Sequence, residues 1–187
     1  GHARPARRVP DQAAKPAQLR RRRLDQPVQV ARVLRACGPR GTEVSDLLRG
    51  ARPGFDVRSL LVQAGVGSLA AAAIGFYSVL FEDNVPLSLV VEPTKAACLF
   101  ESMRFGDGNP HSVTGELNTI MAGLACGDPN PLAWETLYNC ADFFAKCPDY
   151  VAAKGMRVYS VPLTDDPFIV SGESGAVTLG ALMYIME

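Results

Sequence analysis

Two glycines at alternate positions, Gly65 and Gly67, stand directly before Ser68 and a run of small apolar residues. Glycine permits a tight turn in which backbone N–H groups point toward one place. A helix that begins there adds unpaired N–H groups and the positive end of its dipole, which together attract a phosphate. We therefore expect Gly65, Val66, Gly67 and Ser68 to bind the phosphate of a cofactor. The same glycines would also suit a tight turn that only packs a helix against a sheet.

The cysteines and histidines lack the spacing of a metal site. Cysteines stand at positions 37, 98, 126, 140 and 147, and no two of them form a CxxC pair. Cys140 and Cys147 could share a face, but no histidine is near them, so zinc is not expected. Of His2 and His111, the second lies in a Gly/Asn/Pro turn, where we expect it to be solvated. The odd cysteine count and the lack of an apolar leader predict a cytoplasmic protein with reduced thiols.

The glycine pair needs a strand before it and a helix after it. Residues 60–81 carry no charge, and a run of that length could also cross a bilayer. Gln63 and the two glycines interrupt the run, and its alanines make it only weakly apolar. We therefore favour a buried strand of about four residues followed by a helix of about thirteen, beginning at Ser68.

A second strand and helix follow. Residues 86–91 form an apolar run that ends at Glu92 and Pro93, and Thr94 is expected to cap a helix through about Met103. This order predicts an α/β fold with a parallel sheet. Ligands of such sheets bind at the C-terminal strand ends, where residues 65–68 and Glu92 lie. Farther along, apolar residues at helical spacing predict a core stripe: Trp134, Leu137, Tyr138, Ala141 and Phe144.

Charge divides the chain into two segments, residues 1–58 and 59–187. The first carries 14 Lys/Arg and 5 Asp/Glu, and the second carries 5 and 14, so the two net charges cancel. The first segment is rich in proline and has no aromatic residue before Phe55. We therefore expect it to be disordered or to form a marginal helix near residues 28–36. It could be a basic arm for nucleic acid or an acidic membrane, a tail without a role, or coding sequence read out of frame. The last interpretation accounts best for its Arg, Pro, Ala and Gly content.

Longer motifs are spread over the second segment. They are QAGVG at 63–67, VEPTKA at 91–96, NTIMAGLACG at 118–127, CPDYVAAKGMR at 147–157 and SGESGA at 171–176. Together they resemble the C-terminal portion of diaminopropionate ammonia-lyase, a pyridoxal-phosphate enzyme related to threonine dehydratase and the tryptophan synthase β-chain. The resemblance implies part of the three-layer parallel-sheet fold of these enzymes. It also implies pyridoxal 5'-phosphate as cofactor and the elimination of ammonia from 2,3-diaminopropionate to give pyruvate.

The resemblance also implies groups that this chain does not match. The family has a Schiff-base lysine and an acidic residue upstream of the glycine pair, where this chain has only Lys15 in a Pro/Arg-rich context. We therefore assign no catalytic residue, and expect a truncated or frame-shifted portion without activity. The family implies a small amino-acid substrate and a homodimer, with no membrane and no nucleic acid as partner. Alternatives are a serine/threonine dehydratase-like enzyme, and a non-catalytic fragment with a basic nucleic-acid-binding arm.

Glu92, and Asn118 with Thr119, each have a role implied by the resemblance and an ordinary structural role as an alternative. Glu92 stands beside a metal site in related dehydratases, but their carboxylate six positions later is Cys98 here. We therefore expect no metal, and a hydrogen-bonded Glu92 at the end of its strand. Asn118 and Thr119 would open a segment near the cofactor, although Asn118 could equally cap a helix.

The SGESGA motif precedes an expected apolar helix at residues 177–186. In the family an equivalent run approaches the edge of the cofactor, and Ser174 could instead cap the helix. An unfinished parallel sheet leaves an open apolar edge, so we expect poor solubility.

Overall fold

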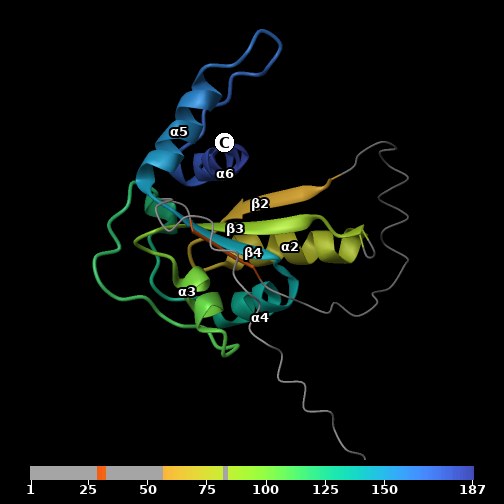
Figure 1. Ribbon diagram of the computed structural model, residues 1–187, viewed down its shortest axis with the longest axis vertical. Helices are drawn as coiled ribbons and strands as arrows, with labels where there is room; N and C mark the ends of the chain where they lie inside the picture. Colours follow the sequence, from red (N-terminus) through yellow and green to blue (C-terminus); the bar gives the residue numbers. More distant parts are fainter. Residues whose placement is uncertain (1–28, 33–56, 82–83) are drawn as a thin grey trace, which may run out of the picture.

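The computed structural model describes residues 29–32, 57–81 and 84–187 (Figure 1). The strands are β1 (Gln29–Arg32), β2 (Ser59–Gln63), β3 (Leu87–Pro93) and β4 (Phe143–Cys147). The helices are α2 (Ser68–Phe81), α3 (Cys98–Phe105), the 3-10 turn η2 (Ala122–Leu124), α4 (Pro131–Cys140), α5 (Asp149–Ser160) and α6 (Glu173–Met186).

One sheet, with strand order β1-β4-β3-β2, organises the described residues. β2, β3 and β4 are parallel, with Val62 opposite Val90 and Val90 opposite Phe144. β1 pairs antiparallel with β4. A parallel sheet that contains β2 and β3 was predicted, because two apolar runs are each followed by a helix signal. The third parallel strand, β4, was not predicted.

Helices cover both faces of the sheet, which gives three layers. α2, α3 and α4 lie on one face, and α5 and α6 lie on the other (Figure 1). Side chains alternate between the layers along each strand: Val90 and Phe144 join the α2–α4 core, whereas Val91 and Ala145 join the α5–α6 core. The expected three-layer α/β architecture is thus present.

α5 and α6 cross at very short range because each has a glycine at the crossing. A Cβ on Gly155 would overlap the carbonyl oxygen of Ala176, and a Cβ on Gly180 would overlap the carbonyl oxygen of Val151. Both glycines are buried. The two helices therefore pack backbone against backbone.

Three expectations about elements need correction. Gln29–Arg32 is a strand, not part of a marginal helix, because it completes hydrogen bonds to β4. The other predictions for residues 1–58, including those for His2, Lys15 and Cys37, lie outside the described residues, apart from residues 57–58. β3 continues through Glu92 and Pro93 before it ends. Phe144 is in the core at 0% exposure, but it belongs to β4 and not to the helix that carries Trp134 and Leu137.

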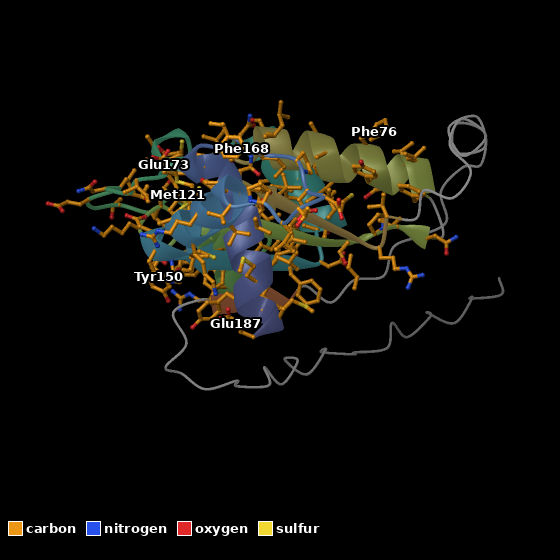
Figure 2. The ribbon with its side chains drawn as sticks, turned by 90° about the horizontal axis from the view of Figure 1, so that it is seen from above. Phe76, Met121, Tyr150, Phe168, Glu173 and Glu187 are labelled. Carbon is orange, nitrogen blue, oxygen red and sulfur yellow. The ribbon has the colours of Figure 1, made fainter. Side chains whose placement is uncertain are left out.

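α2 is apolar on its outer face as well as its inner face. The helix has no charged residue, and Leu69, Phe76 and Val79 are 64%, 55% and 56% exposed. Figure 2 shows Phe76 on the outer side of the helix. Even so, no helix within the described residues is long and apolar enough to cross a membrane.

Candidate functional site

Residues 65–68 form the predicted turn between β2 and α2. Gly67 has φ +97°, a left-handed conformation that favours glycine, and its carbonyl accepts the first helical hydrogen bond, from the N–H of Ala71, at 2.8 Å. Among the described residues, none provides an acceptor for the backbone N–H groups of residues 65–70. The first turn of α2 also contains no acidic residue. A run of unpaired donors at the positive end of a helix is suited to an anion.

Both glycines are also needed for packing, so the second interpretation of the turn holds too. A Cβ on Gly65 would lie 3.1 Å from Cys126 Sγ and 3.3 Å from the carbonyl oxygen of Gly123. A Cβ on Gly67 would lie 3.0 Å from a methyl group of Leu137. The turn is therefore enclosed by neighbouring segments that determine its shape.

Asn130 holds the turn from the start of α4, a role that the sequence analysis missed. Its N–H donates to the carbonyl of Val66 at 2.9 Å, and its side-chain Nδ2 donates to Ser68 Oγ at 3.0 Å. Its Oδ1 accepts from the N–H of Leu132 at 3.0 Å and so caps α4. Because Ser68 Oγ acts as an acceptor here, its own proton is available to a ligand. The Asn130-Pro131 pair is a helix-start signal that could have identified this residue.

Glu92 caps α3, where Thr94 was expected to do so. The carboxylate is 0% exposed and accepts from the N–H groups of Leu99, at 2.9 Å, and Phe100, at 2.7 Å. Ala97 occupies the cap position without a side-chain bond, and Thr94 is exposed. Thr94 was the wrong choice because the Glu92 carboxyl group, from the preceding strand, already satisfies these donors. The prediction of a hydrogen-bonded Glu92 is confirmed.

Burial raises the pKa values of Glu92 and Cys98. Desolvation raises the pKa of Glu92 to about 8 and outweighs its two backbone hydrogen bonds, which favour the charged form. Burial also raises the pKa of Cys98 to about 12, with the Glu92 charge as a smaller cause. Cys98 is therefore a neutral thiol, and it donates to the carbonyl of Gly65 at 3.6 Å. This bond connects the cap of α3 to the glycine turn.

Asn118 and Ser174, the other candidate positions, do not cap helices within the described residues. Asn118 caps no described helix, since η2 begins after Met121 and α4 is capped by Asn130. Ser174 is not a cap either, because Gly172 holds that position. Ser174 instead lies against η2, where a Cβ on Gly123 would be 3.2 Å from the Ser174 Oγ. These caps were mispredicted because each helix begins at a different residue from the one that the sequence favoured.

The cysteines and His111 are held by packing and by side-chain contacts within the fold. The four described cysteines are unbridged, and Cys140 packs in the α2–α4 core whereas Cys147 is in the α5–α6 core, so they share no face. His111 is not simply solvated: its Nε2 lies 2.9 Å from Asp107 Oδ2, and its ring stacks on Phe105. Within the described ranges, no three His, Cys, Asp or Glu side chains are placed to hold a metal ion.

A shallow depression of about 400 Å³ lies beside α3 and is separate from the glycine turn. Lys95, Arg104 and Thr114 are among its lining residues, and none of residues 65–68 is. Arg104 is already paired with Glu101 at 2.6 Å. The glycine turn therefore remains the better candidate for an anion, because its donors have no acceptor within the described part of the chain.

Comparison with known proteins agrees with this architecture. The chain is 47% identical over 130 residues to the diaminopropionate ammonia-lyase of Salmonella typhimurium and 51% identical over 126 residues to that of Escherichia coli K12. These matches cover 68% and 67% of this chain. The chain is a partial match to diaminopropionate ammonia-lyase. It spans about a third of the length of these relatives, 32% and 31% respectively.

Solved structures extend the match to three dimensions. The crystal structure of diaminopropionate ammonia-lyase from Escherichia coli, in complex with an aminoacrylate-PLP azomethine reaction intermediate, has a TM-score of 0.63 at 45% identity. The match covers 75% of this chain and 34% of that one. The processed form of threonine deaminase isoform 2 from Solanum lycopersicum has a TM-score of 0.61 at 16% identity, which shows a shared fold alone. That match covers 75% of this chain and 38% of the other. No family model matches the chain.

Proposed function

We propose that this chain forms the phosphate-binding part of a pyridoxal-phosphate-dependent lyase of the diaminopropionate ammonia-lyase type. In this proposal Gly65, Val66, Gly67 and Ser68 bind the cofactor phosphate. The observation that carries it is the run of backbone N–H groups at residues 65–70, for which the described structure contains no acceptor. The identity of about 50% to the curated lyases supports the same assignment.

The residues fit a phosphate by shape and by charge. The left-handed Gly67 turns the chain so that α2 begins directly behind the phosphate position. Ser68 adds a hydroxyl that Asn130 fixes by donating to it. A phosphate there would meet several N–H donors and the positive helix end together, and such charge-assisted bonds are stronger than neutral ones.

The cofactor, when bound, would supply the electron sink that makes loss of the amino group possible. This chain would supply binding and orientation. No residue is proposed for proton transfer, because no lysine in the chain matches the family's Schiff-base motif. Lys146 and Lys154, on β4 and α5, are paired with Glu101 and Glu187.

The same proposal includes the substrate, the oligomeric state and the location of the complete enzyme. We infer a 2,3-diaminopropionate substrate, a homodimeric complete enzyme and a cytoplasmic location. The activity named for these relatives supports the substrate. The unbridged state of the four described cysteines supports a reducing compartment.

Equilibrium dialysis tests the binding step. The purified chain should bind pyridoxal phosphate, and inorganic phosphate should compete, whereas pyridoxal without its phosphate should bind much more weakly. Equal binding of pyridoxal and pyridoxal phosphate would contradict a site built around residues 65–68.

Turnover is tested in the same preparation. With 2,3-diaminopropionate, the chain by itself should release no pyruvate, and borohydride should not fix the cofactor to the protein. Pyruvate release together with a borohydride-fixed cofactor would show that one of the chain's own lysines serves as the Schiff-base residue.

A further inference from the structure

A half-buried contact joins α5 to the segment before η2 and is not part of the proposed phosphate site. Asp149, the first residue of α5, accepts a hydrogen bond from the Thr119 hydroxyl at 2.5 Å through Oδ1. Its Oδ2 accepts from the N–H of Ile120 at 3.2 Å. Thr119 Oγ1 in turn accepts from the N–H of Met121 at 3.2 Å. One carboxylate and one hydroxyl thus fix three consecutive residues.

This fixed segment continues directly to the glycine turn. Met121 is 0% exposed, and its carbonyl accepts from the N–H of Leu124 at 2.8 Å, which closes η2. The backbone of Gly123 and Leu124 then packs on Gly65, each with an atom 3.3 Å from the Cβ position. The segment occupies the space that a side chain at Gly65 would need, so it cannot shift toward the turn without moving it.

The opposite side of η2 is closed as well. Ser174 at the start of α6 lies against Gly123, and Figure 2 shows Met121 and Glu173 on the same side of the molecule. η2 is therefore held between α6 and Gly65. The hydrogen bond between Thr119 and Asp149 fixes the chain just before the N-terminal end of η2.

A carboxylate at the start of a helix has an ordinary explanation, since it stabilises the positive helix end. That explanation does not account for its partners. Both oxygens of Asp149 bind groups from residues 119 and 120, outside its own helix. The carboxylate therefore joins two segments that are thirty residues apart.

We propose that Asp149 is a positioning residue for the glycine turn, acting through Thr119 and the segment of residues 120–126. The positioning itself follows from the fold. Its consequence for phosphate affinity rests on the proposed function. Loss of the contact lets η2 move away from Gly65, so that the turn samples other conformations.

Amide hydrogen exchange, measured by NMR on the full chain, tests the positioning without any ligand. The N–H groups of Ala71 and Asn130 donate to the carbonyls of Gly67 and Val66, so their exchange reports on the turn. Thr119→Val removes the hydroxyl and keeps the side-chain shape. It should accelerate exchange at both amides by about threefold to tenfold, the loss expected for one partly buried hydrogen bond.

Two matched variants separate positioning from a general loss of stability. Thr119→Ser keeps the hydroxyl and should restore the exchange rates of the unmodified chain. Thr178→Val removes a threonine hydroxyl whose bond to the Gly175 carbonyl stays within α6, and should leave both amides unchanged. Unchanged exchange at Ala71 and Asn130 in Thr119→Val, or equal acceleration in Thr178→Val, would overturn the proposal.

Asp149→Asn provides the second test, and takes the place of Thr119→Val should that variant not fold. Its amide oxygen still accepts from Thr119, but its NH₂ group cannot accept from Ile120. It should accelerate exchange at Ala71 and Asn130 relative to the unmodified chain, and an effect confined to residues 119–121 would overturn the proposal. Titration with inorganic phosphate then tests the proposed function separately. No phosphate binding by the unmodified chain would refute that function, while the exchange comparison would still decide the positioning.

Discussion

The α5–α6 crossing makes the firmest quantitative prediction. Gly155→Ala places a methyl group against the backbone of Ala176 and Gly180, where neither partner can rotate away. Inserting a group into a packed core costs about 1–3 kcal/mol, and a backbone obstacle puts this site at the upper end. Replacing a mid-helix glycine with alanine recovers about 1 kcal/mol of helix propensity. The net expectation is a loss of about 2 kcal/mol.

Gly175→Ala is the matched control. It lies in α6 close to the same crossing, but its added Cβ would meet only the Ser171 hydroxyl, at 2.9 Å. That hydroxyl belongs to a flexible side chain that can turn away. The control should therefore be neutral, or more stable by about 0.4–1 kcal/mol, because alanine restricts the unfolded chain.

Urea and thermal unfolding, followed by the fluorescence of Trp134, measure both variants. Trp134 is the single tryptophan of the chain and is 3% exposed, so its emission reports the folded core. Gly155→Ala should lower the melting temperature by about 4–8 °C, from about 2–4 °C per kcal/mol for a domain of this size. A Gly155→Ala variant as stable as the unmodified chain would refute the backbone-against-backbone packing.

Two further predictions concern the glycine turn and Glu92. Gly67→Ala should lose stability and pyridoxal phosphate binding, because φ +97° is strained for alanine and the added Cβ would meet Leu137. Gly106→Ala is the control, since Gly106 has φ +74° but open space around it. The control should lose about 1–2 kcal/mol of stability and should bind pyridoxal phosphate as the unmodified chain does. Equal binding by the two variants in dialysis would contradict this. Because the pKa of Glu92 is raised from 4.5 to about 8, the folded state keeps a proton that the unfolded state loses. Stability should therefore fall as the pH rises from about 5 to about 8, by at most about 1.4 kcal/mol per pH unit, and Glu92→Gln should lack this fall. Parallel pH profiles of the two proteins in urea unfolding would show that Glu92 is not the group responsible.

Sequence patterns were sufficient for the parallel strands β2 and β3, but not for β4. Uncharged apolar runs at residues 60–62 and 86–91, each followed by a helix signal, gave strands and helices close to their observed bounds. Hydrophobic periodicity predicts such elements because burial on the sheet determines both. β1 was missed because its pairing with β4 depends on a partner more than a hundred residues away.

The surroundings of the site could be predicted only in part. The turn at residues 65–68 was found because glycine spacing is a local signal. The cap by Glu92, the Asn130 bonds to the turn and the Thr119–Asp149 contact all join segments that are distant in sequence. Local rules favoured Thr94, Asn118 and Ser174 as caps, and tertiary contacts placed the helix starts elsewhere.

An NMR titration of the chain with inorganic phosphate tests whether residues 65–70 bind the anion. Phosphate bound at the turn should cause saturable shifts of the backbone amide signals of residues 65–70, with smaller shifts at Asn130. Saturable shifts at Lys95 and Arg104 beside α3, with the signals of residues 65–70 unmoved, would contradict it.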